Sequence, residues 1–328
     1  MAGRRLTVRH ERFPLKEPAP FARSARTHAE TVTVVIEADG QVGRGESVPC
    51  RRRGETIESV MALIRGQKGT IEDGASRLEL DVALPFGAAR NALDCALWDL
   101  EAKLAGLPVW ELAGLNRPGP VVTSHTIAPG PPAIMAAAAA AAADRAILRL
   151  RLCGDGDLER LAAVREAAPR CRLVVDAEES WTQGRLEPYL AAMAAANVEL
   201  VEQPLPVGQD AVLADILHPV PIAADESVQT SEDLEGLTRR YDVATVTLDK
   251  VGGLTEALRF AMKARDVGLG LAVAGGCGSS LGAAPAMLVA QRARFVDLDG
   301  LRQLAQDRSV PLRFEHSTLY PAARELWG

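Results

Sequence analysis

From about residue 120 onward, the chain alternates between two kinds of segment. Short apolar runs rich in β-branched residues are each followed by a longer stretch in which apolar residues recur at helical spacing. The runs with strand character are Val121–Ile127, Ala146–Leu152, Arg172–Ala177, Val198–Pro204, Pro221–Ser227, Val243–Asp249, Leu269–Gly275 and Arg294–Gly300. The stretches with helical spacing include Leu158–Ala168, Leu186–Ala196, Ser231–Arg240, Leu254–Val267 and Leu281–Ala293. Strands that alternate with helices predict βαβ units and a parallel sheet.

The first part of the chain has a different pattern. Thr31–Ala38 has the composition of a strand, and Asp39-Gly40 that of a tight turn leading into a second strand. Helical spacing follows at Thr56–Arg65 and Gly87–Leu104. These elements predict an α+β domain placed before the repeating part.

Eight strand–helix units favour a closed (β/α) barrel over an open doubly wound sheet. An open sheet would usually begin with a glycine-rich phosphate-binding turn, and no GxGxxG motif follows any of the predicted strands. We therefore expect an α/β protein with an α+β capping domain over residues 1–117 and a barrel domain over residues 118–307. The tail, residues 308–328, is expected to complete the capping domain.

Composition and charge exclude several classes of protein. A net charge of −6 provides no electrostatic footprint for nucleic acid and no polybasic membrane patch. The five cysteines include no CxxC pair, so neither a zinc site nor a disulfide framework is expected. Met1–Arg12 lacks the apolar stretch of a secretory signal, and the run Ala136–Ala143 is too short to span a bilayer. We expect a cytoplasmic protein.

Three successive predicted strands of the barrel end in an acidic residue. These residues are Asp176 in RLVVD, Glu202 in VELVE and Asp225 in PIAAD, each about one βα repeat after the last. Because the carboxyl ends of parallel barrel strands meet at one face, the three side chains should be neighbours there. Converging carboxylates repel one another unless a cation compensates them, and all-oxygen ligands suit Mg²⁺. The sequence therefore predicts a magnesium site.

At these residues the chain resembles the enolase superfamily. Within it, the chain is similar to the dipeptide epimerases of the mandelate racemase/muconate lactonizing enzyme group, of which L-Ala-D/L-Glu epimerases are best known. The motifs that carry the resemblance are GESVP at Gly45–Pro49, the helix at Ala88–Lys103, VVDAEESW, VEQPLP and ADES around the three acids, LDKVGGL at Leu248–Leu254, SSLG at Ser279–Gly282 and DLD at Asp297–Asp299. The resemblance implies a modified (β/α)8 barrel of the (β/α)7β type, with a capping domain.

The resemblance also implies a mechanism in which a proton leaves the carbon next to a carboxylate. Mg²⁺ would bind that carboxylate and stabilise the enediolate that forms. In the family, two lysines on opposite faces of the carbon, one on the second strand and one on the sixth, exchange the roles of acid and base. Here those two positions hold Arg151 and Thr247. A guanidinium stays protonated up to about pH 12 and threonine has no useful acid–base range, so the two-base route looks blocked.

Two further residues near these motifs need an interpretation. Glu178 stands where the family has an amide, and we expect its charge to pair with Arg149 and Arg151. Lys250 has a counterpart in the family in addition to the base, and we expect it to face the other side of the strand from Thr247.

The family's substrate contacts map onto five residues of this chain. They are Arg23, Thr126, Arg149, Asp297 and Asp299, and the resemblance implies that the DxD acids hold the ammonium group of a dipeptide.

Three functions remain open at this stage. The chain resembles a Mg²⁺-dependent dipeptide epimerase acting on L-Ala-D/L-Glu-type substrates. Alternatively, it binds Mg²⁺ and a carboxylate ligand without racemisation, or it is a lyase that needs one base or only electrostatic stabilisation. In each case we expect a small-molecule partner, no nucleic acid or membrane partner, and a possible homo-oligomer.

Overall fold

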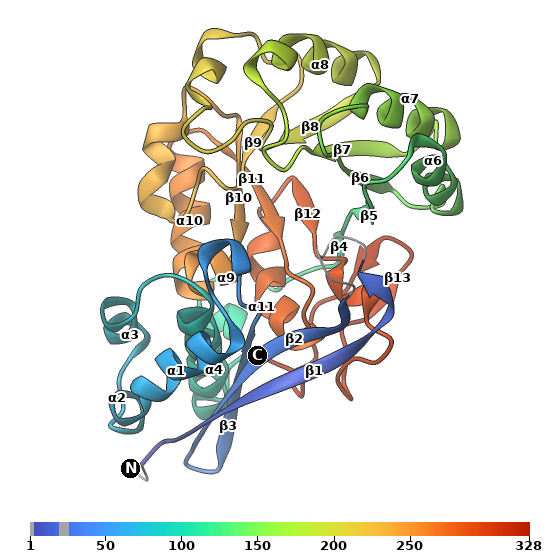
Figure 1. The fold of residues 1–328 in the computed structure, drawn as a ribbon. Coiled ribbons are helices and arrows are strands. Elements are labelled where there is room, and N and C mark those ends of the chain that lie inside the picture. The colour runs from blue at the N-terminus through green and yellow to red at the C-terminus, as the bar shows by residue number, and fades with distance from the viewer. Residues whose placement is uncertain (1–2, 20–25) are drawn as a thin grey trace.

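The computed structural model describes residues 3–19 and 26–328. The described chain begins with a three-stranded antiparallel sheet, β1 (Arg5–Ala19), β2 (Arg26–Ala38) and β3 (Gln41–Ser47), in that order (Figure 1). The predicted turn between β2 and β3 is confirmed, because Asp39 and Gly40 both have positive φ, 47° and 76°. The sequence pattern did not predict β1, in which charged residues interrupt the apolar ones.

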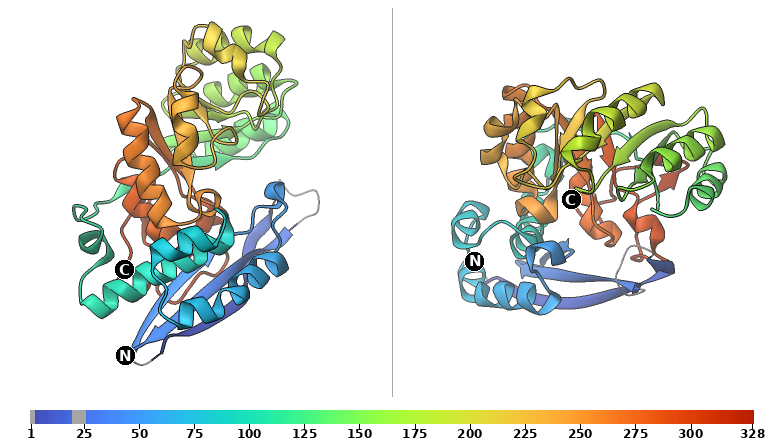
Figure 2. Two further views of the ribbon diagram at one scale, coloured as in Figure 1. Left: turned by 90° about the vertical axis from the view of Figure 1, so that its left-hand side faces the viewer. Right: turned by 45° about the horizontal axis from the view of Figure 1, so that its top comes forward.

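Helices that pack against this sheet or against one another form the cap together with it (Figures 1 and 2). They are α1 (Ile57–Gly66), α2 (Lys68–Glu72), α3 (Arg77–Ala83), α4 (Ala88–Ala105) and α5 (Val109–Leu112), preceded by the 3-10 turn η1 (Arg51–Arg53). Helices α1, α2 and α4 contact the sheet, and α3 and α5 contact α4. Helix α4 is buried almost all round, because it contacts β2 and β3 on one side and α9 and α10 of the barrel on the other. Gly45 permits the close contact with β3, since a Cβ atom there would lie 2.1 Å from the carbonyl oxygen of Ala92.

The eight parallel strands of the barrel follow one another in sequence order around a single sheet. They are β5 (His125–Ile127), β6 (Ile147–Arg151), β7 (Arg172–Asp176), β8 (Val198–Glu202), β9 (Ile222–Ala224), β10 (Val243–Thr247), β11 (Gly270–Ala274) and β12 (Phe295–Asp297). The segments that follow the strands contain α6 (Pro132–Ala141), α7 (Asp157–Ala167), α8 (Gln183–Ala195), η2 (Ala211–Asp215), η3 (Ser231–Leu237), α9 (Leu248–Val251), α10 (Leu254–Asp266), α11 (Ser280–Ala290) and, after the last strand, η4 (Gly300–Gln303). The predicted modified (β/α) barrel with a capping domain is confirmed.

Two predicted elements differ in detail. The segment Val121–Ile127 is two strands, β4 (Val121–Val122) and β5, because the backbone of Thr123 bonds to Ser317 in the tail instead of continuing one ladder. The predicted helix Ser231–Arg240 is the shorter 3-10 helix η3, which contains Gly236, a residue that weakens an α-helix.

One backbone and one side-chain hydrogen bond connect the last and first strands of the barrel, β12 and β5. The backbone N–H of Ser124 donates to the carbonyl of Val296 at 2.9 Å. The hydroxyl of Thr123 accepts from the N–H of Leu298 at 2.8 Å. This junction is called the seam below.

The tail returns to the cap. Its strands β13 (Phe314–Glu315) and β14 (Thr318–Leu319) form a small sheet with β4. The indole of Trp327 donates to the carbonyl of Cys95 on α4 at 3.0 Å. The division of the chain at residues 117 and 307 stays a prediction. Within the described part of the chain, no helix is long and apolar enough to cross a membrane.

Candidate active site

The three predicted metal ligands lie together at the carboxyl ends of neighbouring strands. Asp176 ends β7 and Glu202 ends β8, and the two residues are direct partners across the strand pair. Asp225 follows β9 immediately. Asp176 and Glu202 are each only 4% exposed, so their charges require compensation inside the protein.

A single arginine provides much of that compensation. Nη2 of Arg149, on β6, lies 2.8 Å from Oδ2 of Asp176 and also binds the carboxylate of Glu202. Its Nη1 lies 3.1 Å from Oδ2 of Asp297, at the end of β12. The hydroxyl of Thr245, on β10, donates to the other oxygen of Glu202 at 2.7 Å. Arg149 therefore joins carboxylates from three strands at the end of the barrel where the carboxyl ends of the strands meet. This end is called the mouth below.

Asp225 has a different cation. Nζ of Lys250 lies 2.5 Å from Oδ1 of Asp225 and also donates to the carbonyls of Asp225 and Thr245. The expectation that Lys250 faces away along a strand was wrong. The strand β10 ends at Thr247, and the helical turn α9 carries Lys250 back toward the mouth.

Burial and the neighbouring charges together set the pKa values of these groups. Burial raises the pKa of Glu202 to about 7, although the charge of Arg149 opposes the shift. Burial also raises the pKa of Asp176, against the charges of Arg149 and Arg151. Burial of Arg149 disfavours its charged form, but the charges of Asp176, Glu202 and Asp297 outweigh this effect and keep the pKa of Arg149 above its usual range.

The donor chemistry of this cluster suits a hard divalent cation, because Asp176 and Glu202 already converge on one cationic nitrogen, that of Arg149. In this structure, however, both carboxylates already bind a cation of the protein itself, Arg149. Among residues 3–19 and 26–328, no three His, Cys, Asp or Glu side chains are grouped closely enough to hold a metal ion as they stand. Asp176, Glu202 and Asp225 stay the predicted Mg²⁺ ligands, and in this structure Arg149 binds the first two and Lys250 binds the third.

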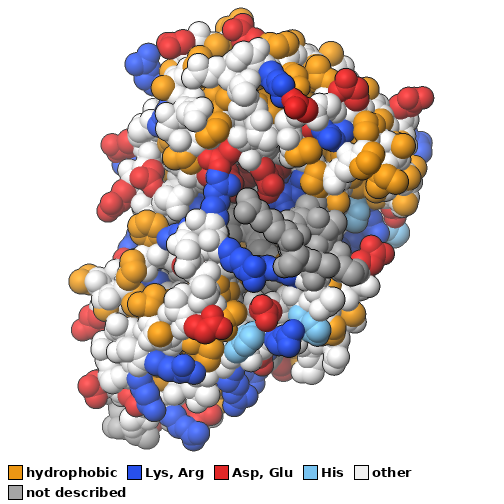
Figure 3. Space-filling view, viewed as in Figure 1, with side chains coloured by type: hydrophobic (Ala, Val, Ile, Leu, Met, Phe, Trp, Pro, Cys, Tyr) orange, Lys and Arg blue, Asp and Glu red, His pale blue; other side chains and the backbone are white. Residues whose placement is uncertain are grey.

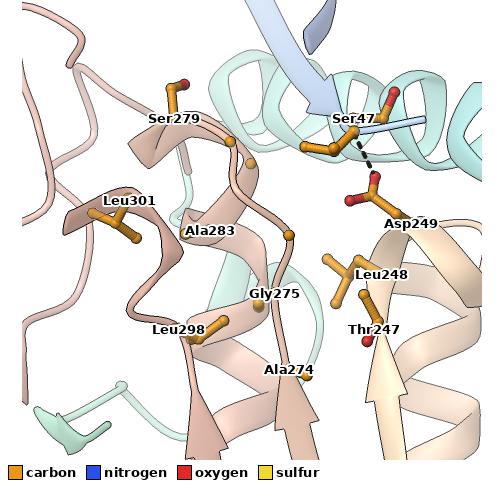
Figure 4. Close-up of a pocket in the computed structure, with 15 residues that line it drawn as sticks. Ser47, Thr247, Leu248, Asp249, Ala274, Gly275, Ser279, Ala283, Leu298 and Leu301 are labelled. Carbon is orange, nitrogen blue, oxygen red and sulfur yellow. Dashed lines mark hydrogen bonds between the residues drawn. The ribbon is translucent and has the colours of Figure 1, made fainter. Parts of the chain in front are cut away.

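Both positions that the resemblance assigns to bases lie at the mouth. Arg151 ends β6, directly opposite Asp176 on β7, with its Nε 3.4 Å from Oδ2 of that residue. Thr247 ends β10. Figure 4 shows Thr247 beside Leu248 at the rim of a pocket. The residue types at the two positions remain unsuited to proton transfer.

The loop after Asp176 turns two acids in different directions. Glu178 and Glu179 have φ values of 44° and 61°, in the left-handed region that non-glycine residues rarely adopt. Glu178 binds Arg151, so the predicted charge pairing is confirmed for this arginine. Glu179 binds Arg52 of the cap, which also lies 3.1 Å from the carboxylate of Glu226 after β9.

Arg52 thus connects the cap to two loops of the barrel mouth. Figure 3 shows acidic and basic side chains gathered around a hollow where the cap meets the barrel. Nothing in the spacing of the arginines at positions 51–53 indicates the barrel carboxylates that Arg52 meets.

The acids of the DLD motif lie at the seam. Asp297 accepts from the hydroxyl of Ser124 at 2.7 Å, and Asp299 accepts from the backbone N–H of Thr126 at 2.8 Å. Burial, followed by the charge of Asp297, raises the pKa of Asp299 to about 7. Asp297, Asp299 and Thr126 therefore occupy one region beside Arg149. Arg23, the remaining predicted substrate contact, lies outside the described residues.

The cap contributes to the same region through buried polar contacts. Asp249 on α9 accepts from the backbone N–H of Val48 at 3.0 Å, the contact drawn in Figure 4, and from the side-chain amide of Asn91 at 2.7 Å. Glu46 accepts from Ser279 at the start of α11 and binds Arg308. The GESVP, LDK and SSLG motifs are therefore joined in one cap–barrel interface.

Sequence reasoning missed Ser124, Thr245 and Gln203 as parts of the site. Gln203, fully buried, accepts from the backbone N–H groups of Asp225 and Ser227 at 3.0 Å and so fixes the position of the third acid. The one available signal was its place in VEQPLP, directly after a predicted ligand.

Comparison with known proteins identifies the family of the chain. Residues 4–114 match the N-terminal domain of the mandelate racemase/muconate lactonizing enzyme family, and residues 133–316 match the enolase C-terminal domain-like family. The chain is 40% identical to the L-Ala-D/L-Glu epimerase of Escherichia coli strain K12, over 97% of this chain and 99% of that protein.

Two solved structures extend the comparison. An enolase family member from Agrobacterium tumefaciens, with homology to dipeptide epimerases and with bound sodium and L-Ala-L-Glu, is 46% identical, with a TM-score of 0.96 over 99% of this chain and 100% of that one. A dipeptide epimerase from Methylococcus capsulatus, complexed with Mg and L-Arg-D-Lys, is 31% identical, with a TM-score of 0.90 over 100% of this chain and 99% of that one. The chain belongs to the mandelate racemase/muconate lactonizing enzyme family of the enolase superfamily, and its relatives include dipeptide epimerases.

Proposed function

We propose that this protein binds the carboxylate of a dipeptide or related amino-acid derivative at the barrel mouth without interconverting its stereoisomers by two bases. Asp176, Glu202 and Asp225 would hold Mg²⁺ there. The metal supplies electrostatic stabilisation of negative charge on a bound carboxylate. The DLD acids and Thr126 would contact the amino end of the ligand.

The observation that carries this proposal is the state of Arg151. Its guanidinium is engaged by Asp176 and Glu178, so two carboxylates hold the side chain in place. A permanently protonated group can orient a carboxylate but cannot remove a proton from carbon. Thr247, at the other base position, cannot replace it.

The acids at the barrel mouth support the proposal that the protein binds a ligand there. A chain that had lost the function of the mouth altogether would have no physical need for several buried acids within a few ångströms, which cost free energy to keep there. The bound ligands in the solved relatives, L-Ala-L-Glu and L-Arg-D-Lys, identify the chemical class to test first.

Proton NMR in D₂O tests the proposal directly. L-Ala-L-Glu and L-Ala-D-Glu are incubated with the protein and excess Mg²⁺, and the α-proton signals and diastereomer ratio are followed. We expect no change in the diastereomer ratio, while isothermal titration calorimetry shows binding. Appearance of the opposite diastereomer, abolished by Asp225→Asn, would overturn the proposal. Exchange of the α-proton without inversion would instead indicate one-sided chemistry.

A further inference from the structure

We propose that Arg149 is a built-in cation of the mouth that competes with a divalent metal ion for Asp176 and Glu202. This inference rests on the part of the proposed function that makes these two acids metal ligands. It concerns metal binding and is independent of whether any proton is transferred.

The contacts of Arg149 define the competition. One nitrogen of its guanidinium, Nη2, binds Asp176 and Glu202 together, the two ligands that end neighbouring strands. The other, Nη1, reaches Asp297 across the mouth. The side chain of Arg149 is 10% exposed, so these ion pairs are little weakened by water or salt.

The shape of the side chain matters as much as its charge. Arginine presents five N–H donors in a planar fork, whereas a lysine ammonium at the same place is a compact point charge. Its two terminal nitrogens let it bind Asp176 and Glu202 with one and Asp297 with the other, whereas a lysine would have to reach all three acids from one nitrogen.

The third predicted ligand also has a cation of the protein beside it, and Glu202 has a second partner. Lys250 holds Asp225, and the hydroxyl of Thr245 donates to Glu202. The cluster therefore does not depend on a metal ion to keep its carboxylates together. A metal ion must gain two ligands at the expense of existing ion pairs, which lowers its apparent affinity.

Calorimetric titration of the full chain with Mg²⁺ alone tests the inference. Arg149→Met removes the competing cation, and Arg149→Lys keeps the charge but on a single nitrogen. We expect Mg²⁺ to bind Arg149→Met at least tenfold more tightly than the parent protein, and Arg149→Lys with an intermediate affinity. Arg172→Met is the matched control, because Arg172 bridges the same two strands to Glu199 at the opposite end of the barrel. Its Mg²⁺ affinity should equal that of the parent.

Thermal unfolding provides a second readout. The melting temperature of the parent should change little between EDTA and Mg²⁺. That of Arg149→Met should be lower in EDTA, where its acids lack a cation, and should rise strongly with Mg²⁺. Both results support the assignment.

Unchanged or weaker Mg²⁺ binding by Arg149→Met would overturn it. If this variant does not fold even with Mg²⁺, Arg149→Lys decides, and binding no tighter than that of the parent overturns the inference. Absence of Mg²⁺ binding in every variant overturns it as well. None of these results bears on stereoisomer interconversion, which depends on Arg151 and Thr247.

Discussion

At the scale of single residues, two side chains separate this chain from the mechanism that its family resemblance implies. Arg151 and Thr247 lie where a pair of tunable ammonium groups would be expected, at the ends of β6 and β10. The strand ends themselves are intact, so the geometry of the site is kept while its acid–base chemistry is changed. Substitution of these two residues by lysine should therefore restore proton transfer.

We expect the double variant Arg151→Lys/Thr247→Lys to gain α-proton exchange. General acid–base groups contribute about 10²- to 10⁴-fold to rate, so exchange from L-Ala-L-Glu in D₂O should rise by at least about 10²-fold over the parent. NMR measures it, and Arg172→Lys serves as the control. A folded, Mg²⁺-binding double variant with no exchange would show that these two residues are not what limits the chemistry.

The variant Glu178→Gln tests the neighbouring ion pair. Glu178 binds Arg151, but the two side chains are 41% and 28% exposed, so the pair contributes little to stability. We expect a loss below about 1 kcal/mol, seen as a melting temperature lower by about 1–3 °C, with nearly unchanged Mg²⁺ binding. A melting temperature equal to that of the parent would show that the ion pair does not stabilise the fold.

Only part of the site could be predicted at this scale. Asp176, Glu202 and Asp225 could be found because each closes an apolar strand, and parallel strands bring their ends together. The role of Arg149 could not, since it depends on the distances among three strands that are far apart in sequence. The partner of Lys250 was missed for a similar reason, because a short helical turn reversed the expected direction of its side chain.

At the scale of secondary-structure elements, apolar runs predicted the buried barrel strands well, since their side chains face other apolar groups on both sides. The strand β1 was missed because it lies at the edge of the cap sheet and alternates charged with apolar residues. The composition of β1 does not indicate a strand, but β1 forms one because it pairs with β2.

The contact between β3 and α4 leads to a prediction about packing. A Cβ atom at Gly45 would lie 2.1 Å from the carbonyl oxygen of Ala92 and 2.7 Å from the backbone nitrogen of Ala96. Gly45→Ala should therefore lower the free energy of unfolding by about 1–3 kcal/mol, measured by urea denaturation. Gly184→Ala is the control: Gly184 lies in α8 with open space around it, and alanine there should be neutral or slightly stabilising.

At the scale of the whole molecule, the cap and the barrel share a buried polar interface. Glu46 of β3 meets Ser279 and Arg308, and Asp249 of α9 meets Val48 and Asn91. Such contacts are costly to separate, because opening the interface in the folded state would leave charged and polar groups without partners. We therefore expect the two parts to unfold together.

The pH dependence of stability provides a test of this interface. Burial raises the pKa of Asp249 from 3.8 to about 7. The folded chain thus keeps a proton that the unfolded chain loses above about pH 4, so the stability contributed by Asp249 falls as the pH rises from about 4 to about 7. Asp249→Asn removes this dependence and keeps an oxygen that can accept from Val48 and Asn91.

Relative to the parent, the Asp249→Asn variant should gain up to about 3 kcal/mol in unfolding free energy between pH 4.5 and pH 8. Urea denaturation at the two pH values measures this difference. A constant difference between variant and parent across the range would show that Asp249 does not titrate as its burial indicates.

The seam of the barrel has a consequence for how the protein responds to a ligand. The groups that fasten β5 to β12 include Ser124 with Asp297 and Thr126 with Asp299, which are the same acids proposed to receive the amino end of a substrate. A bound molecule would therefore bridge the first and last strands of the ring. Binding of the ligand would then also stabilise the contact between β5 and β12. The backbone amides of these two strands should therefore show the largest slowing of hydrogen exchange when the ligand binds.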